Sequence, residues 1–362
     1  MEFSDSIPQD LIEYCILSKL PGKSLARFRL VSEPWRDFID KPRPSKVGVL
    51  LNRAPPRSLA LVTLEGEDLV PKLTELDNDF KYTYNASIMG VCNGLFLIGI
   101  SSMTYIMWNP FVEEYRQIHC PYWSHPYSFC GFGYNPASDE YKIVHVSYHE
   151  NEKRTIEVLR FEHDGMKWKE IEEPFPYGLP TCSPGVVVNG APHWVVGEGQ
   201  HLSGEKPSKI IYFDVAEENF KDVPKPELGC PSCDFDVAAL NGSLCVVAYW
   251  HEQEKKVEIW VMKEHGVAES WTKLAVIPRE CEFFYPLSLV KENELLAEID
   301  KSEVVVYDLK KETFKHVMFS DPVAKIREGP IFPPPVLHRF YQDDCKVATF
   351  VESFVNPATI GI

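Results

Sequence analysis

Residues 241–274 read NGSLCVVAYWHEQEKKVEIWVMKEHGVAESWTKL, and this stretch shows the unit from which most of the chain is built. Its first dipeptide, Asn241-Gly242, tolerates the positive φ angles of a tight reversal. Runs rich in Val, Ile, Tyr and Trp follow, one of them at residues 257–262, and such runs predict β-strands. An aromatic residue, Trp271, and an aliphatic residue three positions later, Leu274, then mark a closing strand. The stretch therefore predicts half or more of a small antiparallel sheet.

The same unit recurs along the chain, with 43 to 53 residues between successive aliphatic positions. The aromatic and aliphatic pairs are Tyr115/Ile118, Trp168/Ile171, Phe220/Val223, Trp271/Leu274 and Phe314/Val317. Repeats of about 40 to 50 residues, each a small sheet that cannot bury both faces alone, are typical of a β-propeller. We predict that the repeated rings pack between neighbouring blades, because a large ring at a fixed position suits sheet-on-sheet packing.

Predicted strands remain at both ends of the five visible repeats. Residues 47–51 and 59–64 precede the repeats, and residues 347–351 follow them. Pairing of these strands would give one mixed blade that closes the ring. We therefore expect residues 47–362 to form a β-propeller of about six blades, in a mainly β protein with a small α-helical N-terminal module. An open double sheet is the alternative.

Residues 1–40 differ from the rest, because their apolar residues recur at helical spacing. Ile12, Ile16 and Leu20 stand at i, i+4 and i+8, which indicates one apolar helix face. The pattern breaks at Pro21-Gly22, resumes, and breaks again before a final turn. We expect three short helices in this region.

A unit of this size buries too little apolar surface to fold alone without a metal, a disulfide or a partner. Either another protein or the chain's own β domain must cover the apolar residues, and the pattern alone leaves both open. The stiff polar linker at residues 41–46 favours separable cores. Ser32 is a good N-cap for the last helical turn.

The strings IPQDLI at residues 7–12 and KLPGKSLARFRLVS at residues 19–32, together with Trp35, closely resemble the F-box of plant proteins. F-boxes dock on the Skp adaptor of cullin-based ubiquitin ligases, so the resemblance implies a Skp-type adaptor and, through it, a cullin as partners. The adaptor-facing or box-core positions that it implies are Ile7, Pro8, Leu11, Ile12, Leu20, Pro21, Leu25, Phe28 and Trp35. One extra residue between Asp10 and Leu20 departs from the usual spacing, which predicts weaker docking than is typical.

The β region resembles the kelch-like F-box-associated domain of plant F-box proteins, including the S-locus F-box-like group. The residues that carry the resemblance are CNGL at 92–95, WNP at 108–110, GFGYNP at 131–136, DEYKIV at 139–144, VEIWVM at 257–262 and SWTK at 270–273. The resemblance implies a non-catalytic substrate-recognition subunit of a Skp-cullin-F-box ubiquitin ligase, which binds a target protein through propeller loops and promotes its ubiquitination. A propeller that scaffolds, inhibits or binds glycans without the adaptor is the alternative.

Charge and composition exclude two classes of partner. The 362 residues include 37 Lys plus Arg against 53 Asp plus Glu, for a formal net charge of −16, and this argues against nucleic-acid binding. No window approaches the roughly 18 uninterrupted apolar residues of a membrane span, so we expect no membrane partner and a cytoplasmic or nuclear location. In that reducing environment we expect the ten cysteines to be thiols.

Catalytic patterns are missing from the sequence. Cys230 and Cys233 have the spacing of half a zinc site, but a zinc ribbon needs a second such pair. Gly131 and Gly133 lack the third glycine of a dinucleotide-binding loop. We therefore expect no catalytic residue, no metal and no cofactor. The expected contribution of the protein is proximity, because it holds a target close to an enzyme elsewhere in the complex.

The densest aromatic stretch outside the strands is CPYWSHPYSF at residues 120–129. Tyr and Trp are favoured interface anchors. The predicted target contacts are Tyr122, Trp123, His125, Tyr127 and Phe129. The alternative is that these rings fill a gap between two blades. Residues 174–184 and 198–207 are weaker candidates of the same kind.

Overall fold

The structure is a computed structural model of the chain. It describes residues 12–17, 20, 22–40, 48–52, 59–65, 70–75, 87–101, 103–120, 128–148, 154–162, 165–178, 180, 185–197, 207–229, 233–250, 255–278, 283–300, 303–317, 347–350, 355, 357 and 360.

Five antiparallel sheets consist of four consecutive strands each, and we call them blades 1 to 5 in chain order. Blade 1 comprises β4 (Ser87–Cys92), β5 (Leu95–Ser101), β6 (Thr104–Asn109) and β7 (Glu114–His119). Blade 2 comprises β8 (Phe129–Asn135), β9 (Glu140–Tyr148), β10 (Arg154–Glu162) and β11 (Gly165–Ile171). Blade 3 comprises β12 (Val186–Val188), β13 (Ala191–Gly197), β14 (Pro207–Asp214) and β15 (Asn219–Val223).

The last two blades follow the same plan. Blade 4 comprises β16 (Asp234–Leu240), β17 (Ser243–Trp250), β18 (Lys256–Met262) and β19 (Trp271–Pro278), with the short 3-10 helix η3 (Ala268–Ser270) before β19. Blade 5 comprises β20 (Phe284–Lys291), β21 (Glu294–Ile299), β22 (Glu303–Asp308) and β23 (Thr313–His316).

A further four-stranded sheet combines the two ends of the β region, and we call it the mixed sheet. Its order is β24 (Val347–Phe350), β1 (Gly48–Asn52), β2 (Leu59–Glu65) and β3 (Val70–Glu75), all described by their backbone alone. β24 pairs antiparallel with β1, as the leftover strands predicted, and β24 lies beside both β4 and β20. β3 is an additional strand that the sequence pattern did not indicate.

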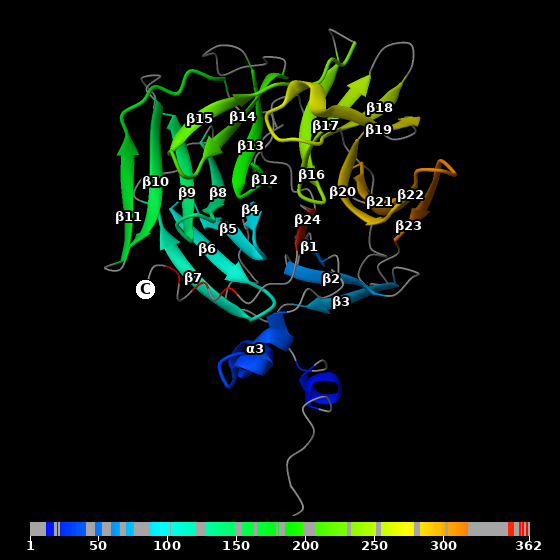
Figure 1. The fold of residues 1–362 in the computed structure, drawn as a ribbon. Coiled ribbons are helices and arrows are strands. Elements are labelled where there is room, and N and C mark those ends of the chain that lie inside the picture. Colours follow the sequence, from blue (N-terminus) through cyan, green and yellow to red (C-terminus); the bar gives the residue numbers. More distant parts are fainter. Residues whose placement is uncertain are drawn as a thin grey trace, which may run out of the picture.

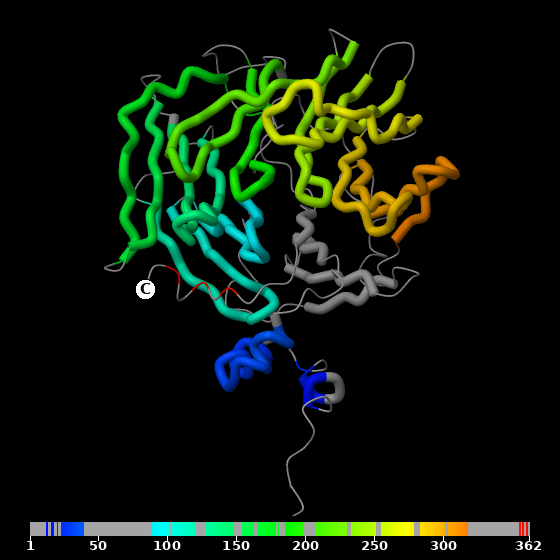
Figure 2. The backbone as a smooth tube through the Cα atoms, viewed as in Figure 1, coloured from blue at the N-terminus to red at the C-terminus, as the bar shows by residue number. Residues whose placement is uncertain are grey.

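The sheets stand around a common axis, and their order around the ring follows the sequence (Figures 1 and 2). The prediction of a mainly β propeller is confirmed, and a double sheet is excluded. Blades 1 to 5 number one fewer than the six blades expected. The mixed sheet stands between blade 5 and blade 1, with β24 beside both β20 and β4.

The Asn-Gly reversal at Asn241 occurs where the sequence predicted it, and two further Asn-Gly pairs have the same geometry. Asn93, Asn189 and Asn241 have φ angles of 48°, 52° and 49°, and the glycine after each has a φ angle of 76° to 80°. Two successive residues with positive φ match the right-handed twist of the strands that they join. These turns connect the first and second strands of blades 1, 3 and 4.

Two of the repeated aromatic residues fasten their blade to the preceding one. The indole nitrogen of Trp168 in β11 donates a hydrogen bond of 2.8 Å to the carbonyl of His119 at the end of β7. Trp271 in β19 makes the equivalent bond of 2.8 Å to Pro224, just after β15. The predicted packing role between blades is confirmed for these rings, whereas Tyr115 is 38% exposed.

Glycines allow blades 2 and 3 to approach closely. A Cβ on Gly131 would lie 2.5 Å from the ring of Trp194, and a Cβ on Gly133 would lie 2.6 Å from the carbonyl oxygen of Gly190. The amide of Tyr134 donates a 2.8 Å hydrogen bond to that same carbonyl. The GFGYNP motif therefore brings the backbones of two blades together.

We predict that Gly133→Ala destabilises the propeller by about 2 kcal/mol, because the new methyl group must displace backbone of blade 3. Urea unfolding followed by circular dichroism would measure the loss. The matched control is Lys169→Ala on the exposed side of β11 in the same blade, which should change the unfolding free energy by less than about 0.5 kcal/mol. Equal stability of Gly133→Ala and the parent protein would contradict the close-approach explanation.

The N-terminal region contains helical segments that lie beside the propeller (Figure 1). A π-helical turn, η1, spans Ile12–Ile16, and α-helices α2 and α3 span Gly22–Phe28 and Glu33–Asp40. The amide of Trp35 donates a 3.4 Å hydrogen bond to the Ser32 hydroxyl, so Ser32 caps α3 as predicted. The start of the predicted first helix lies outside the described residues. No helix in the described ranges is both long and apolar enough to cross a membrane.

Candidate functional site

The helical region has a small core of its own. Leu17, Leu25 and Ile39 are almost completely buried against one another. The half-buried side chains packed around them are those of Ile12, Leu20, Phe28, Trp35, Phe38 and Phe111. Phe28 and Trp35 meet edge to face, with ring centroids 5.6 Å apart. Leu25, one of the predicted adaptor-facing or box-core residues, is therefore a core residue.

Several apolar side chains of this region remain exposed. Leu30 and Val31, just after α2, are 79% and 61% exposed, and Ile16 is 45% exposed. Leu30 and Val31 are neighbours in the chain, and adjacent exposed apolar side chains are typical of interaction surfaces. We call Ile16, Leu30 and Val31 the exposed apolar set. The set suits a protein partner and would be unfavourable in the free chain.

Other predicted docking residues are only partly placed. Ile12, Leu20, Phe28 and Trp35 are half-buried at the edge of the helical core, where a partner could cover the rest of their surface. Ile7, Pro8, Leu11 and Pro21 lie outside the described residues. The helical pattern places Val31 on one stripe with Leu25 and Phe28, but neither Leu30 nor Val31 was predicted as a docking residue.

The chain's own β domain covers this region at one place. Phe111, in the turn between β6 and β7, packs against the helical core, and the Lys23 ammonium lies 3.8 Å from the Glu113 carboxylate. Cover by the chain's own β domain, one of the two possibilities left open by the sequence, is therefore partly realised, and cover by another protein stays a prediction. Blade 1 covers one side of the helical core, and the exposed apolar set stays uncovered.

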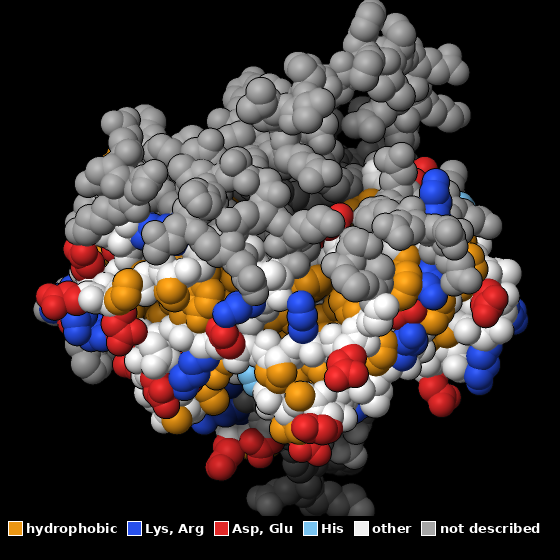
Figure 3. All heavy atoms as spheres, turned by 90° about the horizontal axis from the view of Figure 1, so that it is seen from above, with side chains coloured by type: hydrophobic (Ala, Val, Ile, Leu, Met, Phe, Trp, Pro, Cys, Tyr) orange, Lys and Arg blue, Asp and Glu red, His pale blue; other side chains and the backbone are white. Residues whose placement is uncertain are grey.

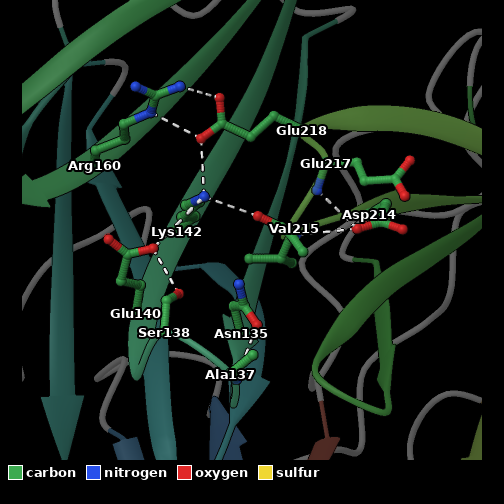
Figure 4. Close-up of polar contacts among 11 residues, drawn as sticks. Asn135, Ala137, Ser138, Glu140, Lys142, Arg160, Asp214, Val215, Glu217 and Glu218 are labelled. Atoms are coloured by element: carbon green, nitrogen blue, oxygen red, sulfur yellow. Dashed lines mark hydrogen bonds and ion pairs between the residues drawn. The ribbon is translucent and has the colours of Figure 1, made fainter.

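A charged cluster joins blades 2 and 3 (Figure 4). The Lys142 ammonium lies 2.9 Å from Glu218 Oε1 and donates a 2.9 Å hydrogen bond to the Val215 carbonyl. Arg160 donates from two nitrogens to the same Glu218 carboxylate, through Nε at 2.8 Å and through Nη2. Burial would raise the pKa of Glu218, but the hydrogen bonds from Arg160 and Lys142 outweigh burial and lower it. Glu218 and a second carboxylate, Glu140 at 3.9 Å from the Lys142 ammonium, balance the two cations, so the cluster is structural.

This cluster explains the DEYKIV motif at residues 139–144. Lys142 reaches blade 3, whereas the hydroxyl of its neighbour Tyr141 accepts a 3.2 Å hydrogen bond from the Asn93 side chain in blade 1. Adjacent residues of β9 point to opposite sides of the sheet and therefore contact the blades on either side. The motif links three consecutive blades.

We predict that Glu218→Gln lowers the unfolding free energy at pH 7 by about 2 kcal/mol, because Lys142 and Arg160 lose a charged acceptor. The folded-state pKa of Glu218 is depressed, so its contribution is present above the unfolded pKa and disappears as the pH falls through the folded value. Urea unfolding at pH 7 and at progressively lower pH would show the variant approaching the parent in acid. Glu303→Gln, in an exposed pair with His316, is the control and should have little effect.

A second buried polar cluster contains a histidine, a cysteine and a glutamate, but it lacks the geometry of a catalytic triad. The Nδ1 atom of His145 lies 3.5 Å from Glu157 Oε2 and 3.7 Å from Cys120 Sγ. Burial lowers the pKa of His145, but its contacts with Cys120 and Glu157 outweigh burial and raise it to about 9. Because both partners share one ring nitrogen, the histidine cannot relay a proton between them. In the described part of the chain no three His, Cys, Asp or Glu side chains are grouped to hold a metal ion.

Most of the predicted target contacts lie outside the described residues, namely Tyr122, Trp123, His125 and Tyr127. Phe129 is described, and it is only 3% exposed. Its ring packs on Phe175 and Trp194, with centroid distances of 5.5 and 5.3 Å, in the core between blades 2 and 3. For Phe129 the packing alternative holds, and a target cannot reach it.

A hollow of about 230 Å³ lies at the weaker candidate stretch, residues 174–184. Pro174, Pro176 and Tyr177 line one side of it, and Asn219 and Phe220 of β15 line the other. The hydroxyl of Tyr177 is fixed by a 2.6 Å hydrogen bond to Asp222. The hollow is large enough for one side chain of a bound protein.

Comparison with known proteins decides the family. Residues 6–46 match the F-box domain model, and residues 58–355 match the model of the F-box associated beta propeller domain. The chain belongs to the F-box proteins that carry this propeller. Hence the helical region is an F-box, and blades 1 to 5 belong to the F-box-associated propeller.

Its relatives include three F-box proteins of Arabidopsis thaliana. One is 25% identical and covers 87% of this chain and 88% of its own length, and F-box protein CPR1 is 26% identical and covers 87% and 85%. An F-box/kelch-repeat protein is 24% identical and covers 90% and 94%. Among solved structures, the WD40 domain of SCAP from fission yeast has a TM-score of 0.37 and 13% identity over 73% of this chain and 62% of its own. That similarity is too low to carry a functional argument.

Sheet topology separates the F-box from the candidate target loops. In a four-stranded antiparallel blade, the first and third turns lie on one face of the ring, and the second turn and the crossover to the next blade lie on the other. Phe111, which contacts the F-box, lies in a third turn. The described ends of β7, β11 and β13, after which the candidate stretches 120–129, 174–184 and 198–207 follow in the sequence, lie on the face opposite the Phe111 turn.

The described surface of the propeller carries both signs of charge. In the view from above, acidic and basic side chains are interspersed with hydrophobic ones (Figure 3). On that face of the described surface no large patch of one sign is visible.

Proposed function

We propose that this protein is the substrate-recognition subunit of a Skp-cullin-F-box ubiquitin ligase, acting without catalytic residues of its own. The observation that supports this best is the exposed apolar set on an F-box that is joined to a propeller. An isolated apolar set would be a liability in solution, whereas an adaptor would bury it. A location in the cytoplasm or the nucleus is part of this proposal.

The proposed mechanism is proximity. The F-box binds the Skp-type adaptor, which connects to the cullin, while the propeller holds a target protein near a ubiquitin-loaded enzyme. Tethering raises the effective concentration of the target's lysines at that enzyme and makes the transfer effectively intramolecular. No charge relay or metal on this chain is needed for such a role.

The proposed target surface is the propeller face that carries the crossovers and second turns. Tyr122, Trp123, His125 and Tyr127 remain the predicted contacts, and the hollow at Pro174, Pro176 and Tyr177 adds a described site on a crossover. Because the F-box contacts a turn of the other face, a target on this face would not compete with the adaptor. We further propose that the mixed sheet acts as a sixth blade and closes the ring.

The test of adaptor binding is a double substitution in the exposed apolar set, Leu30→Asp with Val31→Asp. Both side chains are mostly exposed, so the F-box should still fold, whereas two buried charges at an interface should weaken adaptor binding by at least about tenfold. Purified full-length protein and Skp adaptor would be compared by isothermal titration calorimetry.

The matched control is Val276→Asp, a similarly exposed apolar residue on the outer strand of blade 4, which should bind the adaptor like the parent. Failure of the parent protein to bind a Skp adaptor would refute the proposal. If the double variant binds the adaptor as tightly as the parent protein, Leu30 and Val31 are not part of the docking face.

A further inference from the structure

Phe111 is the one described propeller side chain in the hydrophobic cluster of the F-box. It lies in the turn between β6 and β7, and the corresponding turn positions of blades 3 and 5 hold Ala216 and Lys310, both exposed. A large ring in an otherwise small or charged turn position needs a packing partner. Here the partner is the core formed by Leu17, Leu25 and Ile39.

The turn that presents Phe111 is held firmly. The side-chain oxygen of Asn109 accepts a 2.9 Å hydrogen bond from the Phe111 amide, and Asn109 is completely buried. Val112 is also buried, and Glu113 closes the turn with a φ angle of 58°. The ion pair between Lys23 and Glu113 adds a second contact to the F-box, but it is exposed and therefore weak.

Asn109 also contacts the C-terminal segment. Its side-chain nitrogen donates a 2.8 Å hydrogen bond to the Val355 carbonyl, and Arg116 in β7 donates to the Ile360 carbonyl. Val355 and Ile360 pack against the hydrophobic cluster between blades 1 and 2. In Figures 1 and 2 the described C-terminal residues run past β7.

The residue type at position 109 fits this double role. The equivalent residues Asp214 and Asp308 also accept hydrogen bonds from their turn amides, at 3.0 Å. A carboxylate can only accept, whereas an amide accepts with its oxygen and donates with its nitrogen. Asparagine in blade 1 can therefore shape the turn and hold the C-terminal segment at the same time.

We infer that Asn109 and Phe111 form a joint that fixes the orientation of the F-box on the propeller, and that Val355 and Ile360 of the C-terminal segment lock this joint. Phe111 is a positioning residue in this inference, because it belongs to a propeller turn and packs on the core of the F-box. The importance of that orientation for ubiquitin transfer rests on the proposed function. The existence of the joint rests on the contacts of Asn109 and Phe111 and is independent of the proposed function.

The test measures the angular freedom of the F-box in the free full-length chain. Spin labels on unnatural residues at the exposed positions Arg27 and Lys169 report the distance between the F-box and blade 2 by double electron-electron resonance. The parent protein should give one narrow distance distribution. Phe111→Ala should at least double its width, and Phe111→Leu, which keeps an apolar side chain, should restore most of the narrow distribution.

The lock is tested by two further variants. Asn109→Asp keeps the turn acceptor but loses the donor to Val355, and deletion of residues 355–362 removes the segment itself. Both should broaden the distribution. Lys310→Ala, at the Phe111 position of blade 5, is the matched control and should leave the distribution unchanged. Circular dichroism checks that each variant stays folded.

An unchanged distribution in Phe111→Ala would overturn the joint. Broadening in Phe111→Ala without any in the deletion variant or in Asn109→Asp would overturn the lock. Adaptor binding, measured separately, should be within about twofold of the parent in Phe111→Ala, because the exposed apolar set is untouched. A chain that fails to bind the adaptor but shows these changes would refute the proposed function and leave the joint standing.

Discussion

A four-stranded sheet that is apolar on both faces cannot be stable by itself, and every other feature of this protein depends on that constraint. Each blade must be covered on two sides, so the sheets form a ring in which every sheet covers its neighbours. Contacts between blades therefore carry the specific chemistry. Trp168 and Trp271 fasten one blade to the preceding one, Gly133 allows backbones to touch, and the Lys142 and Glu218 pair joins blade 2 to blade 3.

Features with a local cause could be predicted from the sequence. Asn241-Gly242 specifies a turn through its own φ preferences, and Ser32 caps the helix that directly follows it. The strand runs and the regular spacing of the aromatic positions predicted a propeller, because each repeated unit has the same faces to bury and buries them against its neighbours. The same signals also gave the pairing of the first and last strands, since those strands had no other partner.

Features that depend on distant residues could not be predicted. Nothing in the sequence around Lys142 indicates that it pairs with Glu218, because only the fold brings the two together. In the same way, nothing near Phe111 indicates that the F-box packs on its ring. For Phe129 the sequence suggested a target contact that the fold buries. An aromatic stretch is equally typical of a binding loop and of a segment in the protein core. Burial separates the two, and burial depends on the neighbouring blade. The exposure of Leu30 and Val31, on which the proposed adaptor docking rests, is likewise visible only in the folded chain.

The mixed sheet has a consequence for how the protein is made. Its strands β24 and β1 come from opposite ends of the propeller, so the ring cannot close until the ribosome has released nearly the whole chain. Until then the edge of β1 lacks the strand that pairs with it, and β4 and β20 lack the strand that lies beside both. Unpaired strand edges favour association with other chains, so the propeller is most exposed to aggregation while it is still an open arc.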